Sequence, residues 1–314
     1  MLLRPRFTPP YLSQLQAAVR RLPSEHPARP AVEQELYRTS SGDYGERRMD
    51  YYYQFLPDEV TLLHQVQLPS PITSSSFQMD TLLLHPQFTA ILEIKHQRGS
   101  LHLMPETGQM KQLSSGEVYG YTCPVQQVRQ QEVQLRAYAE TCGYTNPILT
   151  HVFFTHSSVY FDTAADATPL PVSRPIMLSS IVKQWLQETA SIPPQTEALQ
   201  RLQKKMLTES TSHWCILDKF QLTPSDFLVG VWCTSCSRLS MRRRYSTWQC
   251  SSCGIKQAQA HVEALRDFHF LHPFPFRSDQ LQRWMRLTNQ RAARRLAAPF
   301  LVKKAGTYVY RFNF

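Results

Sequence analysis

The chain lacks the long apolar runs that secretion or membrane insertion requires. Met1-Leu2-Leu3-Arg4 is followed by Pro5, Arg6, Pro9 and Pro10, so the hydrophobic core of a signal peptide is missing. No stretch approaches the roughly 20 consecutive apolar residues of a membrane-spanning helix. We therefore expect a soluble, cytoplasmic protein that has no membrane partner.

Cysteines are few, and their spacing argues against a disulfide framework. The 314 residues include seven cysteines, and four of these form two C-x-x-C pairs. Such pairs fit a reducing compartment and a bound metal better than a set of disulfides. The hydrophobic fraction of 42% supports real cores, and the length allows two or three domains.

Acidic residues are scarce in the last quarter of the chain. From Cys233 to Phe314 there are 15 Lys and Arg against 3 Asp and Glu, a local charge of +12. The preceding residues hold 19 basic against 21 acidic side chains, so they carry −2 of the net charge of +10. A basic segment of this kind favours a polyanionic partner, and we expect nucleic acid, with DNA favoured.

Residues 78 to 95 read as an antiparallel hairpin. Thr81–Leu84 and Phe88–Ile94 are rich in aliphatic and β-branched residues, which favour strands, and Pro86 lies between them as a turn former. If the turn centres near Pro86-Gln87, Asp80 at the start of the first strand falls opposite the end of the second strand.

Three charged residues lie at the open end of this hairpin. Asp80 is expected opposite Glu93, and cross-strand Cβ atoms are about 4.5 to 5.5 Å apart. Glu93 and Lys95 share a face because side chains two apart on a strand point the same way. Two carboxylates beside an ammonium suit a Mg²⁺-dependent phosphodiesterase, although the same charges also occur on solvated hairpins.

Helices are expected on either side of the hairpin. The first opens at Gly42, with Ser41 or Asp43 as its cap, and runs to about Leu56. Its first turn would hold Glu46, where the helix dipole favours a carboxylate; the alternative is a surface acid.

The segments after the hairpin complete an α/β pattern. Thr61–Leu68 precedes the hairpin as a strand, and 105–121 reads as a polar loop. Pro124 suits the first position of a helix that carries Gln127 and ends near Gly143. The apolar run 148–154 is typical of a strand buried in an α/β sheet.

Four short motifs in this order resemble a known family. They are Gly42-x-x-Gly45-Glu46, Gln78-Met79-Asp80, Glu93-Ile94-Lys95 and Pro124-Val125-Gln126-Gln127. Together they resemble the nuclease-related domain (NERD) of the PD-(D/E)xK nuclease superfamily, over roughly residues 40 to 160. One departure is Cys123, where the family pattern often has Asn before the proline.

The resemblance implies a fold and a set of roles. The fold would be a mixed sheet flanked by helices, of the PD-(D/E)xK nuclease type. Asp80, Glu93 and the backbone carbonyl of Ile94 would bind Mg²⁺ or Mn²⁺, and Lys95 would orient the attacking water or steady developing charge. Glu46 would support the site from the first helix, and Gln127 from the later one.

The two cysteine pairs predict a structural zinc site. Cys233-x-x-Cys236 and Cys250-x-x-Cys253 are separated by thirteen residues, which fits two knuckles holding one Zn²⁺ through four thiolates. The pattern resembles a zinc ribbon. Between the knuckles, Arg242-Arg243-Arg244-Tyr245 forms a basic tip for nucleic acid, unless it is only a solvated hairpin.

The last segment predicts two helices followed by two strands. Ser278 could cap a helix to about Leu287, and 290–297 makes a second helix carrying Arg291, Arg294 and Arg295. The strands Phe300–Lys303 and Thr307–Phe312 would form a wing. This arrangement resembles a winged helix-turn-helix, with the second helix as the groove reader.

These interpretations divide the chain into five parts. They are a helical extension (1–40), a nuclease-like domain (41–165), a helical connector (166–228), a zinc ribbon (229–256) and a basic winged-helix-like segment (257–314). The favoured hypothesis is a metal-dependent nuclease that prefers DNA. The alternative is a non-catalytic nucleic-acid-binding or regulatory protein that retains a nuclease fold.

Overall fold

The computed structural model describes residues 2–4, 6–162, 170–210, 215–272, 276–303 and 310–312. The chain forms two compact units: the first comprises Met1–Phe7 and Thr39–His213, and the second comprises Thr8–Arg38 and Trp214–Phe314. The five-part division stays a prediction, and the contacts assign 8–38 to the C-terminal unit. Within the described residues, every helix is too short or too polar to cross a membrane.

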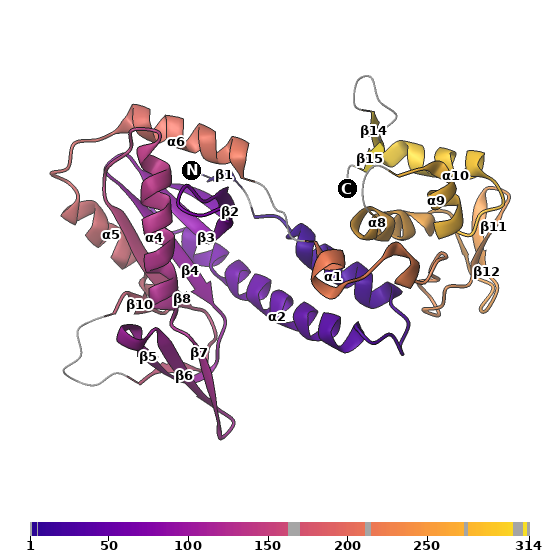
Figure 1. Cartoon of the computed structure of the whole chain (residues 1–314), viewed down its shortest axis with the longest axis horizontal. Coiled ribbons are helices and arrows are strands. Elements are labelled where there is room, and N and C mark those ends of the chain that lie inside the picture. Colours follow the sequence, from indigo (N-terminus) through magenta and orange to yellow (C-terminus); the bar gives the residue numbers. More distant parts are fainter. Residues whose placement is uncertain are drawn as a thin grey trace. The chain divides into compact units, whose positions relative to one another are not determined.

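A six-stranded mixed sheet forms the centre of the first unit (Figure 1). β2, β3 and β4 pair antiparallel, whereas β1, β8 and β10 each run parallel to a neighbour. In spatial order the strands are β1 (Leu2–Arg4), β2 (Thr61–Pro69), β3 (Ser76–His85), β4 (Phe88–Lys95), β8 (Ile148–Phe154) and β10 (Val172–Ser173). The expected hairpin is confirmed, since His85 pairs with Phe88 across Pro86-Gln87.

Helices cover both faces of this sheet. α4 (Pro124–Glu140) and α6 (Thr196–Glu209) pack on the face that includes Leu63, Leu82 and Ile91. α5 (Leu178–Glu188), which follows a short 3-10 helix (Pro175–Met177), packs on the opposite face. Apolar residues on both faces exclude water from the sheet, which explains the nearly continuous burial along β4. The expected mixed α/β fold is thereby confirmed.

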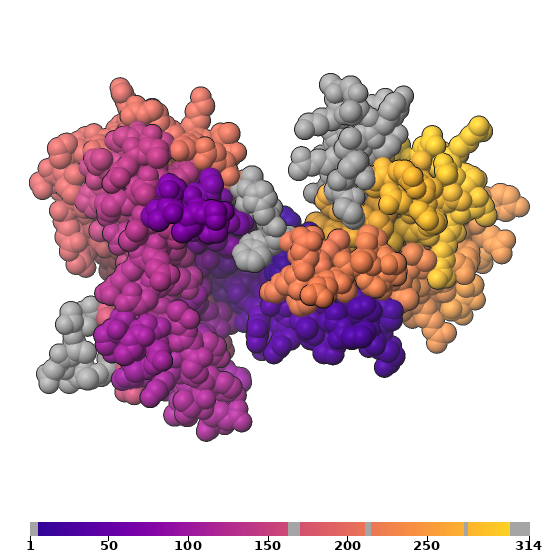
Figure 2. Space-filling view, in the orientation of Figure 1, coloured from indigo at the N-terminus to yellow at the C-terminus, as the bar shows by residue number. Residues whose placement is uncertain are grey.

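A smaller four-stranded sheet takes two of its strands, β6 and β7, from the segment predicted to be a polar loop. Its spatial order is β7 (Glu117–Thr122), β6 (Gln109–Ser114), β5 (Gly99–Met104) and β9 (Val159–Phe161). The loop prediction for 105–121 is wrong, because only Pro105–Thr107 forms a 3-10 turn before the β6–β7 hairpin. β7 is exposed along its length, so it shows no apolar alternation. The magenta lobe in Figure 2 includes this sheet.

The helix expected to open at Gly42 begins much earlier. α2 (Arg29–Arg48) runs through Gly42, and the separate short helix α3 (Asp50–Tyr53) follows it. The cap assignment was therefore wrong. Asp43 pairs with Arg47 one turn later at 2.6 Å and supports the helix interior. Local cap-like residues did not stop a helix that was already propagating.

The second unit combines helices with two small sheets (Figure 1). Its helices are α1 (Pro10–Arg21), α7 (Ile216–Phe220), α8 (His261–Leu271), α9 (Ser278–Trp284) and α10 (Gln290–Ala297), with 3-10 turns at Pro224–Asp226 and Ala298–Phe300. Its strands are β11 (Met241–Arg244), β12 (Thr247–Cys250), β13 (Lys256–Gln257), β14 (Leu301–Lys303) and β15 (Tyr310–Phe312).

A buried ion pair joins the N-terminal helix α1 to α8 in this unit. Arg21 Nε lies 2.7 Å from Asp267 Oδ2, and both side chains are fully buried. Arg21 Nη1 also donates to the carbonyl of Gly230 at 2.8 Å. Removing one partner of such a pair costs about 3–5 kcal/mol, because the other charge stays buried. Residues 8–38 are thus an integral part of the C-terminal unit.

Candidate functional site

Among the described residues of the first unit, Glu93 is the carboxylate that accepts the most side-chain hydrogen bonds. Its Oε1 accepts hydrogen bonds from Lys95 Nζ at 2.6 Å and Gln127 Nε2 at 2.7 Å. Its Oε2 accepts one from Gln131 Nε2 at 3.0 Å. The side chain is only 3% exposed. β4 and α4 together hold this carboxylate in one orientation.

Asp80 lies where the sheet ladder is interrupted. The β3–β4 pairing ends at Thr81–Leu92, and Asp80 Oδ2 instead accepts the backbone N–H of Ile94 at 2.8 Å. On the other side Gln65, opposite Asp80, has a φ of 53°, so the β2–β3 ladder is distorted here too. The N–H and C=O groups of one strand residue point to the same side of the strand. The carbonyl of Ile94 therefore points, like its N–H, towards the interrupted ladder at Asp80.

Burial and neighbouring charges shift the pKa values of Asp80 and Lys95. Burial raises the pKa of Asp80 well above its ordinary value, and the nearby Glu93 and Glu46 carboxylates raise it further. Burial alone would lower the pKa of Lys95, but Glu93 and Asp80 outweigh that effect, so its pKa is raised. Lys95 is therefore a fixed cation at neutral pH. Its Nζ also donates to Gln127 Oε1 at 3.0 Å.

Glu46 reaches the site from the end of its helix, not the start. It lies in the last turn of α2, where the macrodipole disfavours a carboxylate, so the dipole explanation predicted from the sequence is wrong. Arg6, rather than the helix dipole, stabilises the Glu46 carboxylate through an ion pair. Burial raises the pKa of Glu46 to about 7 even against the Arg6 charge, and Asp43 and Glu93 add to the rise.

Arg6 belongs to a polar network that the sequence did not reveal. Its Nη2 lies 3.4 Å from His64 Nδ1, which in turn lies 2.9 Å from Thr81 Oγ1. Tyr53 donates to the same Thr81 oxygen at 3.0 Å. Burial and the Arg6 charge lower the pKa of His64 to about 4, so the ring is neutral at pH 7. No local motif marks Arg6, because its partners are remote in the sequence.

Gly45 allows α2 to approach the site closely. A Cβ atom at this position would lie 2.5 Å from His96 Cβ and 3.0 Å from Thr155 Oγ1. His96 Nδ1 and Thr155 Oγ1 are 2.9 Å apart, and the Thr155 N–H donates to the Lys95 carbonyl. The glycine therefore brings its neighbour Glu46 towards the strand that carries Lys95.

The donor set of this site fits a hard divalent cation. Asp80, Glu93 and the Ile94 carbonyl offer oxygen ligands, which Mg²⁺ prefers. Gln131 is 6% exposed, and its Oε1 has no hydrogen-bond donor among the described residues. Its Nε2 is fully used by Glu93 and the Gln78 carbonyl. Gln131 was missed, although it lies one helical turn after Gln127 on the same face.

The four predicted cysteine ligands come together in the second unit. Cys233, Cys236, Cys250 and Cys253 place their Sγ atoms within 4.8 Å of one another, and they are the only such cluster of His, Cys, Asp or Glu among the described residues. Two of the Sγ–Sγ distances are 3.6 Å. With Zn–S bonds of about 2.3 Å, a tetrahedron has edges of about 3.8 Å, so the cluster can bind zinc.

The six predicted nucleic-acid-binding arginines are distributed over the ribbon and α10. Arg242 and Arg244 are exposed on β11, whereas Arg243 stacks over Trp248 at 5.6 Å. Arg291, Arg294 and Arg295 are exposed on α10. The predicted helix pair corresponds to α9 and α10, and the predicted wing strands to the antiparallel pair β14–β15. Residues 304–309 of the predicted wing lie outside the described residues.

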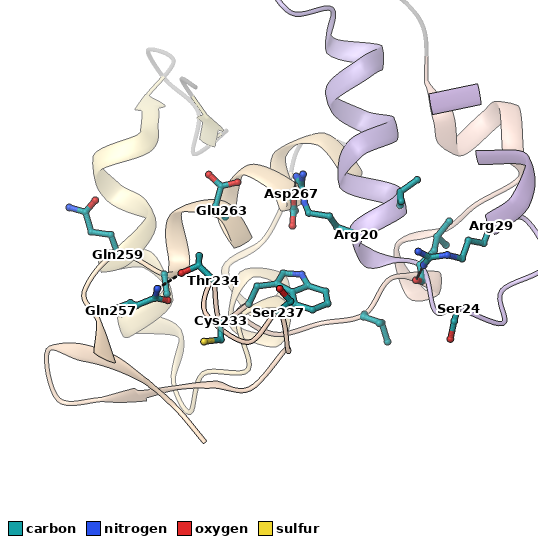
Figure 3. Close-up of a pocket in the computed structure, with 15 residues that line it drawn as sticks. Arg20, Ser24, Arg29, Cys233, Thr234, Ser237, Gln257, Gln259, Glu263 and Asp267 are labelled. Carbon is teal, nitrogen blue, oxygen red and sulfur yellow. Dashed lines mark hydrogen bonds and ion pairs between the residues drawn. The ribbon is translucent and has the colours of Figure 1, made fainter. Parts of the chain in front are cut away.

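A separate cavity of about 810 Å³ lies beside the first cysteine knuckle (Figure 3). Cys233, Thr234 and Gln257 line one side, and Glu263 and Asp267 come from α8. Asp267 is neutralised by Arg20 and Arg21, so it offers no free charge to the cavity. No sequence pattern marks this cavity, since its walls come from segments at both ends of the chain.

Comparison with known proteins supports the reading of the first unit. Residues 41–155 match the family model described as the nuclease-related domain. No curated protein and no solved structure matches the chain significantly. The matched range contains Glu46, Asp80, Glu93, Lys95 and Gln127, together with Gln131. Within residues 41–155 the chain is therefore similar to the nuclease-related domain.

Proposed function

We propose that this protein is a metal-dependent nuclease that hydrolyses phosphodiester bonds, with DNA as the favoured substrate. The observation that carries the proposal is the arrangement around Glu93. Asp80 and Glu93 lie just beyond Thr81–Leu92, the last β3–β4 pair, and Lys95 Nζ lies 2.6 Å from Glu93 Oε1. The match to a nuclease-related domain over 41–155 supports the same reaction class.

Asp80, Glu93 and the Ile94 carbonyl would hold Mg²⁺ or Mn²⁺. The cation would neutralise the two carboxylates and stabilise negative charge on the scissile phosphate. Burial raises the pKa of Asp80 most, and repulsion from Glu93 and Glu46 raises it further. A bound cation would relieve that repulsion, which supports this assignment. The orphan Oε1 of Gln131 would accept a hydrogen bond from water inside the site.

Lys95 would stabilise the charge that develops on the phosphate during hydrolysis. Gln127 holds Lys95 and Glu93 simultaneously, so it fixes their separation. Glu46 has a pKa of about 7 and can therefore exchange a proton near neutral pH, which suits a group that assists water. Arg6 would position Glu46 through its ion pair.

The second unit would bind the nucleic acid. Zinc on Cys233, Cys236, Cys250 and Cys253 would have a structural role, since all four positions are filled by protein. Arg242, Arg243 and Arg244 of the ribbon and Arg291, Arg294 and Arg295 of α10 would contact phosphates. The α9–α10 pair followed by β14–β15 supports a winged-helix-like docking segment.

The test is cleavage by the full-length protein with Mg²⁺ or Mn²⁺ on single-stranded DNA, duplex DNA and RNA. Asp80→Asn and Lys95→Met should each lower the rate by about 10²–10³-fold, because each removes a group that stabilises charge at the reacting phosphate. Lys111→Met is the matched control, since Lys111 is exposed on β6. Wild-type rates in Asp80→Asn and Lys95→Met would contradict this site.

A non-catalytic nucleic-acid-binding role is the second candidate. One observation favours it: Glu93 already has three side-chain donors, so the site is satisfied internally. A metal titration by calorimetry discriminates the two functions. Binding of Mn²⁺ that is lost in Glu93→Gln supports the nuclease, whereas absent or unchanged binding supports the second role.

A further inference from the structure

The tip of the β11–β12 hairpin is a fully exposed tyrosine. Arg244 pairs with Thr247, so Tyr245 and Ser246 alone form the turn. Tyr245 is 100% exposed, whereas Trp248 on the next strand is 1% exposed. Trp248 also donates from Nε1 to His261 on α8 at 3.2 Å, which anchors the hairpin to its unit. The ring of Tyr245 is thus presented to solvent by a fixed support.

The backbone at Tyr245 makes this choice of residue costly. Its φ is 49°, in the left-handed region where two-residue turns favour Gly, Asn or Asp. A residue with a large side chain pays steric strain there, and an exposed ring regains nothing by packing. Folding therefore gives no reason for a tyrosine at this position.

Two cations precede Tyr245 on β11. Arg242 and Arg244 are two residues apart on β11, so they project from the same side of the hairpin, and both are exposed. Within the described residues, the ion pairs of α8 and α9 use Arg266, Arg277 and Arg283 instead. Arg242 and Arg244 form no ion pair with any described residue, so their charge is available for an anion.

A third cation, Arg243, lies on the opposite face of β11 from Arg242 and Arg244. Arg243 projects to the opposite side, over Trp248, and its Nη1 is buried without a hydrogen-bond partner among the described residues. Burial lowers the pKa of Arg243, and the charge of Arg295 lowers it further, which brings α10 and the ribbon into one electrostatic field. Phosphates of a nucleic-acid strand would reduce the repulsion between Arg243 and Arg295.

We propose that Tyr245 stacks on an unpaired base while Arg242 and Arg244 bind the flanking phosphates, so the ribbon tip selects single-stranded nucleic acid. The inference rests on the proposed function in that the second unit docks the substrate. An unpaired base offers a free face to an aromatic ring, whereas a base inside a duplex is covered on both faces. Single strands in this sense include the unpaired part of a junction.

The experiment measures binding by the full-length protein without Mg²⁺ or Mn²⁺. Fluorescence anisotropy would use labelled oligothymidylate and oligouridylate of about 20 nucleotides and a blunt duplex of the same length. Tyr245→Asn suits the left-handed backbone but lacks the ring, so it should weaken single-strand binding about 5- to 150-fold. Tyr245→Phe should bind like the wild type, and duplex binding should change much less. The two labelled single strands distinguish DNA from RNA.

Tyr37→Ala is the matched control, because Tyr37 is 77% exposed in the same unit but lies outside the ribbon. Single-strand binding by Tyr245→Asn at the wild-type level would overturn the inference. Equal losses on duplex and single strand, or an equal loss in Tyr37→Ala, would overturn it too. This binding assay contains no Mg²⁺ or Mn²⁺ and measures no cleavage, so a failed nuclease assay and a failed stacking assay remain distinguishable.

Discussion

Glu93 in the first unit accepts hydrogen bonds from Lys95, Gln127 and Gln131, whereas Arg242 and Arg244 in the second unit face solvent. A buried charge must be satisfied within the fold, because water cannot solvate it. An exposed cation is already solvated and needs no protein partner. The difference suits a fixed site for a small cation in one unit and a surface for a flexible polyanion in the other.

The two candidate metal sites differ in the same way. The cysteine cluster takes all its ligands from two short knuckles, 233–236 and 250–253. The acidic site draws on β3, β4, α4, the end of α2 and Arg6. A local site can form with its own hairpin, whereas a site built from distant segments forms only when the whole unit folds.

Loss of zinc should have the largest effect of the changes considered, and it should be confined to the ribbon. Cys250→Ser should release the metal and unfold the ribbon, because zinc contributes about 10–16 kcal/mol to the folding of small zinc domains. Elemental analysis would give the zinc content, and the fluorescence of buried Trp248 would report unfolding. Cys215→Ser, which lies outside the cluster, should retain the metal. Wild-type zinc content in Cys250→Ser would refute the site.

Two glycines on α2 offer a matched test of the acidic site. Gly45→Ala should destabilise the first unit by about 1–3 kcal/mol, because its Cβ would overlap His96. Gly42→Ala meets nothing within 4 Å and should stabilise the helix by up to about 1 kcal/mol. Urea unfolding measures both. Similar free energies of unfolding for the two variants would mean that α2 does not pack closely against His96.

The pKa of Glu46 predicts a pH dependence of stability. Its folded value of about 7 exceeds its ordinary value of 4.5, so the protonated form stabilises the fold. This contribution is complete below about pH 4.5 and is lost as the pH rises through about 7. The wild type should lose on the order of 2 kcal/mol over this window, and Glu46→Gln should not.

Urea unfolding at several pH values would measure this difference. Glu140→Gln serves as the control, because Glu140 is exposed at the end of α4. Arg6, Asp43 and Glu93 are the charged groups that face Glu46, and all three remain in the variant. Parallel pH profiles for the wild type and Glu46→Gln would show that Glu46 ionises freely in the folded state.

The smallest expected effect concerns salt. Replacing both Arg242 and Arg244 by Ala should reduce the slope of log affinity against log salt concentration by about 1.4 for a single strand, since each phosphate contact contributes about 0.7. Replacing Arg277 and Arg283 should change the slope less, because both pair with Asp279. Anisotropy titrations at several salt concentrations measure the slopes. Equal changes in the two double variants would remove the distinction between paired and unpaired arginines.

Much of the local structure could be predicted from residue types and spacing. Pro86-Gln87 between two apolar runs gave the β3–β4 hairpin, and Pro124 marked the start of α4. Local signals failed in two ways. Ser41 and Asp43 resemble caps but lie inside α2, and the hairpin in 105–121 has an exposed strand with no apolar alternation.

The candidate acidic site was only partly predictable, for a physical reason. Glu93 and Lys95 lie two residues apart, so their shared face follows from the strand period. Arg6 reaches Glu46 because β1 joins the edge of the sheet beside β2, and no local pattern specifies that pairing. The pKa of Glu46 depends on burial, which exists only after packing.

The amino-acid sequence by itself determined the zinc-ligand spacing, the basic last quarter, the hairpin and the order of the nuclease-related motifs. Each of these depends on neighbours in the chain or on composition. Only the tertiary structure decided that Arg6 and Gln131 join the acidic site, that Glu46 enters it from a helix end, and that residues 8–38 complete the second unit. Those contacts link remote residues, and their free energy arises when water is excluded between packed elements.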